Sequence, residues 1–246
     1  MSVRATPLIP FRGAEVWLVD LAASAAAVHD IEVRTPRLSL DDCAKCDRMA
    51  DEAAGRERRA AHIALRVLIE RAFGPHWRKV AYHVSAEGKP MLPGAMGDFS
   101  LSHIPGWALI ALTSEGPIGA DLERRRPVTL SADRRGQIEA AAAALAPQAL
   151  LPVEPEAQLL QSWVRLEAVA KAEGTGIGPL LTELGVMRSG HASHASGSVL
   201  AEKYSVHDLN PGEGRYAAVA VARGQALPGL MILPARAEEI AALVRL

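Results

Sequence analysis

Cysteine is scarce in this sequence, which holds two cysteines among 246 residues. Cys43 and Cys46 form a C-x-x-C motif, and no second pair or downstream histidine cluster at zinc-finger spacing completes it. We expect two ordinary thiols, with a redox or metal-binding role as the alternative. A chain without further cysteines fits a reducing compartment.

The sequence also lacks a long apolar run and an excess of charge of either sign. No uninterrupted apolar segment approaches the roughly 20 residues that a membrane-spanning helix needs. The first residues include Arg4, Pro7, Pro10 and Arg12, which is not typical of a signal peptide. The formal net charge is -1, so no global field favours nucleic acid or an anionic membrane. We therefore expect a cytoplasmic protein that binds neither.

Neither a Walker A sequence nor a G-x-G-x-x-G sequence occurs, so the common nucleotide-binding folds are unsupported. The composition, with 49% hydrophobic and 22% charged residues, is that of an ordinary globular protein. The length allows one large domain or two domains of about 120 residues each.

Hydrophobic periodicity and turn residues predict the order of the elements. Residues 22–29 are ambiguous, and residues 185–198, with His191 and His194, are expected to form a flexible loop rather than a metal site. Strands are predicted over residues 15–21, 79–84, 99–103, 107–113, 117–123, 204–207 and 215–222, and helices from a cap at Ser39 and over residues 55–74, 140–146, 159–173 and 235–244. This order predicts an α+β fold in two similar halves rather than an alternating βαβ fold.

Two groups of acidic residues suggest chemistry. Asp121 and Glu123 are two apart on a predicted strand, so they face the same side and repel each other. Magnesium binds through one or two such carboxylates together with substrate phosphates, and the alternative is an exposed strand end. On the helix at 159–173, Trp163, Glu167 and Lys171 share one face. Glu167 and Lys171 alone are also compatible with a plain surface ion pair.

The predicted helix at 55–74 carries basic residues beside its apolar stripe. They form either a solvated face or an anion site for phosphate. The residues concerned are Arg59, His62 and Arg66.

Four short motifs follow one another along the chain: Gly88-Lys89-Pro90, Ser100-Leu101-Ser102-His103, Gly119-Ala120-Asp121-Leu122-Glu123, and Trp163-x-x-x-Glu167-x-x-x-Lys171 with Gly174-Thr175-Gly176. In order and spacing the chain resembles the Sfp-type 4'-phosphopantetheinyl transferase family over roughly residues 38–221. The resemblance implies a pseudo-twofold fold of two α+β halves, residues 1–115 and 116–246, with the coenzyme in the cleft between them.

The resemblance also implies a reaction. The phosphopantetheine arm of coenzyme A moves to a serine of an apo acyl or peptidyl carrier protein, and adenosine 3',5'-bisphosphate is released. Carriers of lipid or secondary metabolite biosynthesis are the expected partners. A chain of two halves needs no partner to complete its cleft, so a monomer is expected.

Residues that match the motifs inherit expected roles from the resemblance. Asp121, Glu123 and Glu167 match the magnesium-binding acids, and Glu167 is also the candidate general base for the serine. Lys171 matches a lysine that holds the pyrophosphate and steadies the leaving group.

Further matches concern the coenzyme. His103, with Ser102 beside it, matches a histidine of the active site that contacts the pyrophosphate, and Lys89 matches a lysine near the adenosine end. The family places basic residues for the 3'-phosphate on the helix at 55–74, where this chain has Arg59, His62 and Arg66.

Two positions depart from the family pattern. The family helix often carries an arginine where this chain has His62, and the later motif usually reads Trp-x-x-Lys-Glu. Leu166 stands in the lysine's place, and Arg165 points about 100° away around the helix. The change either weakens contacts with the coenzyme or carrier or reflects an unusual carrier. Two other functions therefore stay open: a non-catalytic protein that binds coenzyme A or a carrier, and a magnesium-dependent phosphohydrolase that uses the same carboxylates.

Overall fold

The computed structural model describes residues 11–186, 194–227 and 229–244, and backbone contacts divide the chain into two compact units. Unit 1 comprises residues 1–12, 20–81 and 233–246, and unit 2 comprises residues 13–19 and 82–232. The mixture of helices and sheets confirms the predicted α+β class. The predicted halves, residues 1–115 and 116–246, differ from these two units because they were expected from similarity of fold and not from contacts. The division into halves stays a prediction.

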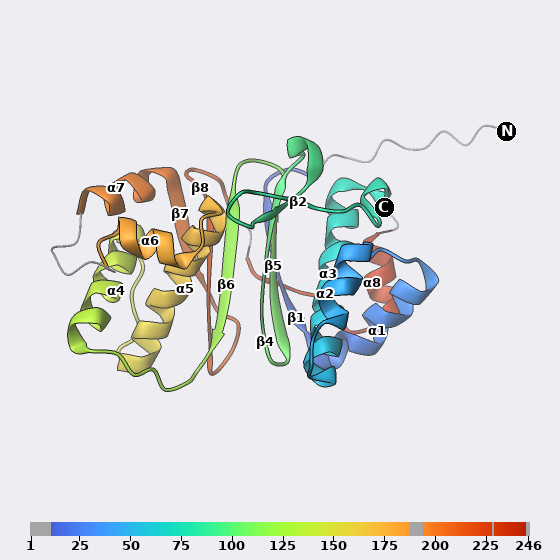
Figure 1. Ribbon diagram of the computed structural model, residues 1–246, viewed down its shortest axis with the longest axis horizontal. Coiled ribbons are helices and arrows are strands. Elements are labelled where there is room, and N and C mark those ends of the chain that lie inside the picture. The colour runs from blue at the N-terminus through green and yellow to red at the C-terminus, as the bar shows by residue number, and fades with distance from the viewer. Residues whose placement is uncertain (1–10, 187–193, 228, 245–246) are drawn as a thin grey trace. The chain divides into compact units, whose positions relative to one another are not determined.

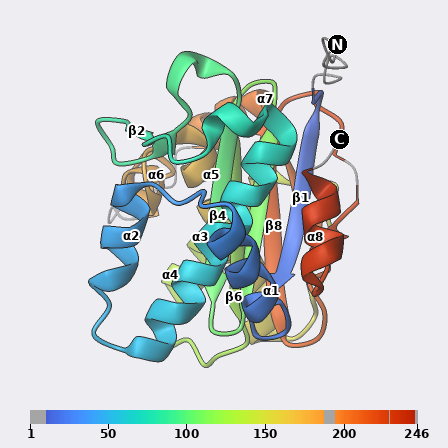
Figure 2. The ribbon, with the colours of Figure 1, turned by 90° about the vertical axis from the view of Figure 1, so that its right-hand side faces the viewer.

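The described part of unit 1 is helical (Figures 1 and 2). Its elements are α1 (Leu21–Arg34), α2 (Leu40–Asp47), α3 (Glu52–Phe73), the short 3-10 helix η1 (Pro75–Trp77) and α8 (Ala237–Leu243). Helix α1 packs against α3 and α8, and α2 packs against α3. The predicted cap at Ser39 is confirmed as a capping box with Asp42, so local hydrogen bonds define where α2 begins.

Buried ion pairs connect the helices of unit 1. Arg66 on α3 donates to Asp42 Oδ2 on α2 through Nε at 2.8 Å and through Nη2 at 2.5 Å. A second buried pair joins Arg37 Nε to Glu70 Oε2 at 2.6 Å. Removing one partner of a buried pair leaves the other charge buried without compensation. Each substitution of this kind should therefore lower the free energy of unfolding.

The strands of unit 2 form two sheets and a hairpin within the described residues. One sheet has the order β4-β5-β1-β9, the other has the order β6-β8-β7, and β2 pairs with β3. The strands are β1 (Ala14–Asp20, whose last residue falls in unit 1), β2 (His83–Val84), β3 (Pro90–Met91), β4 (Asp98–Ile104), β5 (Trp107–Thr113), β6 (Ile118–Arg124), β7 (Tyr204–Leu209), β8 (Arg215–Ala222) and β9 (Met231–Ile232), with the 3-10 turn η2 (Pro93–Ala95) before β4.

The helices of unit 2 are α4 (Ala132–Leu145), α5 (Pro155–Glu173), α6 (Ile177–Glu183) and α7 (His194–Lys203). Helix α5 packs on β6 and β8, and α4 packs on α5 (Figure 1). Alanine and leucine side chains of α5 lie in the apolar core of this unit. Helix α5 ends at Gly174, whose left-handed backbone, with φ of 79°, suits glycine. No helix in the described ranges is long and apolar enough to cross a bilayer.

Most predicted elements are confirmed, but helix α4 begins at Ala132 rather than at residue 140, and helix α6 was not predicted. Three other segments also differ. The ambiguous residues 22–29 belong to α1. The strand predicted over residues 79–84 is wrong except at residues 83–84, because Lys79 has a φ of 59° and interrupts an extended backbone. In the predicted loop at 185–198, residues 187–193 lie outside the described residues, among them His191. Helix α7 starts at His194, so the loop prediction is wrong there.

Side chains join strands β4 and β6, which belong to different sheets. Alternate residues of β4 face β6 and accept hydrogen bonds from its backbone amides. The three bonds run from Ile118 N to Asp98 Oδ2 at 2.9 Å, from Ala120 N to Ser100 Oγ at 3.0 Å, and from Leu122 N to Ser102 Oγ at 3.2 Å. This series sets the position of β6 along β4.

The buried pair of Asp42 and Arg66 predicts a loss of stability at acid pH. Burial raises the pKa of Asp42, but the nearby imidazole of His62, the charge of Arg66 and hydrogen bonds from Ser39 outweigh it and hold that pKa well below 3.8. Because the folded pKa is depressed, the stabilisation is present above the unfolded pKa and is lost as pH falls below about 4. Asp42→Asn should lower the free energy of unfolding at pH 7 by about 3–5 kcal/mol.

Urea unfolding from pH 7 to pH 3 measures both effects. The stability of Asp42→Asn should depend less on pH than that of the unaltered protein. Asp30→Asn is the matched control, because Asp30 forms an exposed pair with Arg34, and it should change stability by less than about 1 kcal/mol. Equal losses for the two variants would contradict the importance of burial.

Candidate active site

Helix α5 lies directly against strand β6 at Gly119. A Cβ atom at this position would lie 2.0 Å from the carbonyl oxygen of Ala168 and 2.4 Å from the amide nitrogen of Ala172. Both atoms belong to the helix backbone, so a side chain cannot be accommodated by a rotamer change. The contact brings Glu167 and Lys171, which precede those two alanines, close to the acidic residues of β6.

Asp121 accepts hydrogen bonds from two side chains. Lys171 Nζ donates to Asp121 Oδ1 at 2.6 Å and to the carbonyl of Ala120 at 3.2 Å. Ser102 Oγ donates to the same carboxylate oxygen at 2.8 Å. Asp121 is 6% exposed, so strand β4, strand β6 and helix α5 each contribute one member of a largely buried cluster.

Glu123 and Glu167 complete the acidic group. Glu123 Oε1 lies 3.3 Å from Arg126 Nη2, in a pair that is open to solvent. Burial raises the pKa of Glu167 above its ordinary value, the charges of Asp121 and Glu123 raise it further, and Lys171 opposes the shift. The charges of Asp121 and Glu123 therefore act on Glu167, and the shared role of the three acids stays a prediction.

The acids fit magnesium by their chemistry. Carboxylate oxygens are the hard ligands that magnesium prefers, and proteins commonly supply one or two of them while substrate phosphates supply others. Among the described residues, no group of three or more histidine, cysteine, aspartate or glutamate side chains is already arranged around one ion position. The donor set thus suits a magnesium ion whose coordination includes oxygen atoms from outside the chain.

Lys89 lies in the loop of the β2–β3 hairpin and reaches the end of α5. Its ammonium lies 2.5 Å from Asp98 Oδ2, and it also donates to the carbonyls of Ile118 at 3.2 Å and Ala172 at 3.4 Å. A cation is favourable there because the last carbonyls of a helix carry partial negative charge. Lys89 also lines a pocket of about 500 Å³, together with Asp98 and Glu173.

Ser102 and His103 are neighbours on β4 and point to opposite faces of the strand. Ser102 is buried, and its hydroxyl group donates to Asp121 and accepts from Leu122 N–H. His103 is exposed. The hydroxyl group of Ser102, which was predicted to bind the coenzyme, therefore forms its hydrogen bonds within the protein and positions Asp121.

The basic residues of unit 1 have different environments. Arg66 is 2% exposed, and its guanidinium group donates to Asp42 and to the carbonyl of Val80. Its place is therefore inside the unit rather than on the solvated face considered from the sequence. His62 Nδ1 lies 3.7 Å from the other oxygen of Asp42. Of the three predicted residues, Arg59 is the most open to solvent, with its side chain 34% exposed.

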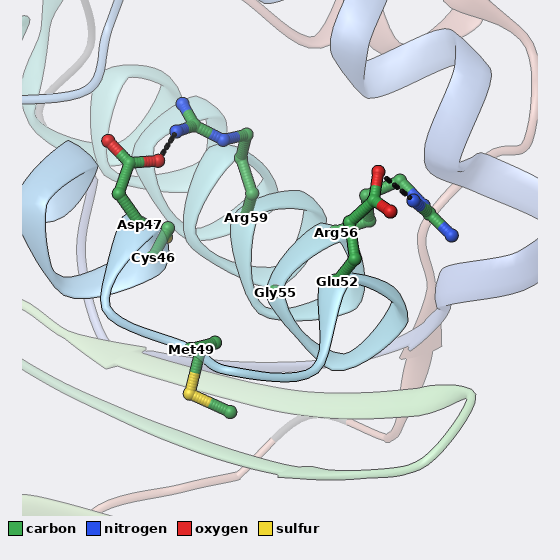
Figure 3. A pocket seen from close by; sticks show the side chains of 7 residues that line it. All are labelled: Cys46, Asp47, Met49, Glu52, Gly55, Arg56 and Arg59. Carbon is green, nitrogen blue, oxygen red and sulfur yellow. Dashed lines mark hydrogen bonds and ion pairs between the residues drawn. The ribbon is translucent and has the colours of Figure 1, made fainter.

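Arg59 lines a pocket of about 250 Å³ between α2 and α3 (Figure 3). Its Nη2 atom donates to Asp47 Oδ1 at 2.6 Å, and its Nη1 atom lies 3.9 Å from Cys43 Sγ. Cys43 and Cys46 are free thiols, and burial raises the pKa of Cys46. The raised pKa favours the protonated form, which is the less reactive form of a thiol.

Leu166, which departs from the family pattern, is fully buried in the core of unit 2. Its neighbour Arg165 is also fully buried and donates to Asp208 through Nε at 2.8 Å and Nη2 at 2.5 Å. A lysine at position 166 would have to bury its charge in this core. Leucine is therefore the residue type that this environment favours.

Sequence reasoning missed several residues that support the site. Asp98 and Ser100 alternate with Ser102 along β4, and this spacing was the available signal for the contacts with β6. The sequence shows Gly119 as part of a motif but does not predict its contact with α5. Nothing in a single sequence identifies the helix that will pack against a given glycine.

The protein has an α+β fold, and its helix α5 and strand β6 bring acidic residues and a lysine together, as in the active site of an enzyme. No protein-family model matches the chain. The 4'-phosphopantetheinyl transferase AcpT of Salmonella typhimurium strain LT2 is 34% identical over 133 residues, which are 52% of this chain and 66% of AcpT. The match thus spans just under two thirds of that relative. The match confirms the resemblance to the 4'-phosphopantetheinyl transferase family that the motifs predicted.

The close approach at Gly119 predicts the effect of one added methyl group. Gly119→Ala should lower the free energy of unfolding by about 3 kcal/mol, because the methyl group would push α5 away from β6. Gly136→Ala in α4 is the matched control: a Cβ there meets nothing within 4 Å, so helix propensity should raise stability by up to about 1 kcal/mol. Chemical denaturation measures both, and a neutral Gly119→Ala would refute the close contact.

Proposed function

We propose that this protein transfers the 4'-phosphopantetheine arm of coenzyme A to a serine hydroxyl of an apo acyl or peptidyl carrier protein. The reaction depends on magnesium and releases adenosine 3',5'-bisphosphate. The observation that carries the proposal is the placement of three acids and Lys171 at one helix–strand contact, in a chain that resembles this family. The printed name of AcpT supports the same class of reaction.

The chemistry requires a nucleophile, a base and a stabilised leaving group. The serine oxygen attacks the phosphorus that carries the pantetheine arm, and the bond to the bridging oxygen of the pyrophosphate breaks. Glu167 is assigned as the base that accepts the serine proton, directly or through water, and its raised pKa suits that task. Lys171 is assigned to the phosphates, where a cation stabilises the charge of the leaving group.

Magnesium would be held by carboxylate oxygens from among Asp121, Glu123 and Glu167 together with phosphate oxygens of the coenzyme, and it would supply neutralisation of charge and orientation of the pyrophosphate. Asp121 needs a fixed orientation for this purpose, and Ser102 holds one of its oxygens. A carboxylate that binds a metal is a weaker base than a free one, so ligation is the primary role assigned to Glu167 and the role as base is secondary.

The pocket lined by Lys89 is assigned to the adenosine end of the coenzyme. Its volume of about 500 Å³ is in the range of small-molecule sites, and it includes Ala172, which follows Lys171 directly. His103 is assigned to the pyrophosphate, and Arg59 and His62 to the 3'-phosphate. Arg66 was predicted with them, but its pairing with Asp42 favours a structural role. We further expect a cytoplasmic monomer acting on carriers of lipid or secondary metabolite biosynthesis.

A carrier mass-shift assay tests the proposal. With magnesium and coenzyme A, an apo carrier protein from the same genome should gain about 340 Da, the mass of the transferred group. Asp121→Asn and Glu167→Gln should slow the addition at least about 100-fold, because they remove a ligand and a base. Asp133→Asn, at an exposed aspartate of α4, is the isosteric control and should react normally.

Other outcomes separate the alternatives. Addition of a chelator should stop the transfer, and magnesium should restore it. Coenzyme A binding without transfer to any acyl or peptidyl carrier of that genome would favour a non-catalytic binding protein. Release of phosphate or bisphosphate without a carrier would favour a phosphohydrolase.

A further inference from the structure

The acid cluster already contains a cation supplied by the chain itself. The ammonium of Lys171 lies 2.6 Å from Asp121 Oδ1, which is hydrogen-bonding distance for a charged pair. The Lys171 side chain is 30% exposed, while that of Asp121 is 9% exposed. The lysine therefore has a route to solvent, whereas the aspartate stays fixed by Ser102.

The charges around this pair do not balance without an ion. Lys171 pairs with Asp121, its charge also acts on Glu167, and Arg126 lies 3.3 Å from Glu123, so two cations accompany three carboxylates. Lys171 is also the charge that favours the ionised form of Glu167. Removing the ammonium from Asp121 would thus leave two neighbouring acids without a close cation, and a divalent ion at the same place would restore the balance.

We propose that Lys171 is the internal counter-ion of this cluster, that a divalent cation displaces it from Asp121, and that the released ammonium turns to the phosphates of the coenzyme. This inference rests on the proposed function and adds an order of events: the metal displaces Lys171 from Asp121, and Lys171 then contacts the phosphates. The metal and the coenzyme both favour the state in which Lys171 has left Asp121, so binding of one tightens binding of the other by the same factor.

Manganese binding to the full-length protein tests the inference without any transfer reaction. In the absence of coenzyme, Lys171→Met should bind Mn²⁺ about tenfold more tightly than the unaltered protein, because the competing charge is gone. Lys171→Arg retains the charge and should bind Mn²⁺ like the unaltered protein. Titration calorimetry gives the affinities, and thermal melting confirms that each variant is folded; Lys171→Gln replaces the methionine variant if that does not fold.

The coupling supplies a second readout. Saturating coenzyme A, with no carrier present, should tighten Mn²⁺ binding in both proteins, because its phosphates can bind the metal directly. The factor should be at least about twofold larger in the unaltered protein than in Lys171→Met, because only the unaltered protein also has an ammonium that moves to the phosphates. Equal or weaker Mn²⁺ binding by Lys171→Met would overturn the inference, and so would a lack of Mn²⁺ binding by every variant. If the manganese results hold but no carrier is modified, the proposed transfer fails and the competition between lysine and metal stands.

Discussion

The arrangement of the candidate site depends on the absence of a side chain at Gly119. Backbone atoms of α5 approach β6 within a distance that leaves no room for a Cβ. A helix normally keeps about 10 Å between its axis and a neighbouring layer because side chains fill the space, and a glycine removes that spacer. The short separation lets Lys171, a long side chain on the helix, reach Asp121 on the strand while its own backbone stays helical.

The series of side-chain hydrogen bonds between β4 and β6 provides the second constraint. Asp98, Ser100 and Ser102 each accept from an amide of β6, so they take the place that a carbonyl would occupy in a continuous sheet. This arrangement leaves the two sheets separate and still aligns their strands. It also turns Ser102 toward Asp121, so the same interaction that joins the strands orients an acid of the site.

Electrostatics connects these constraints to the proposed chemistry. Burial of Glu167 and the like charges of Asp121 and Glu123 raise its pKa, and Lys171 compensates for this only in part. Crowded carboxylates cost stability unless a cation joins them, and in the proposed function a divalent ion with phosphate ligands would supply the missing positive charge. The apolar core around Leu166 stabilises the position of Lys171 and Glu167, because its packing holds α5 on the sheet.

Local features of the sequence determined much of the fold. Alternation over residues 99–103 predicted β4, because the period of side chains along a strand is two. The Ser39 and Asp42 pair predicted the start of α2, since a capping box needs only neighbours in the chain. The four-residue spacing of Glu167 and Lys171 likewise placed both on one helical face before any tertiary contact was known.

Tertiary structure alone decided which partner each of these side chains meets. Residue type and periodicity set the face on which a side chain lies, but they do not specify the opposing element. For this reason the burial of Arg66 against Asp42, the hydrogen bonds of Ser102 to Asp121 and Leu122, and the fit of α5 over Gly119 were not predictable from the sequence. Each joins segments distant in the chain, and only packing brings those segments within hydrogen-bonding or van der Waals distance.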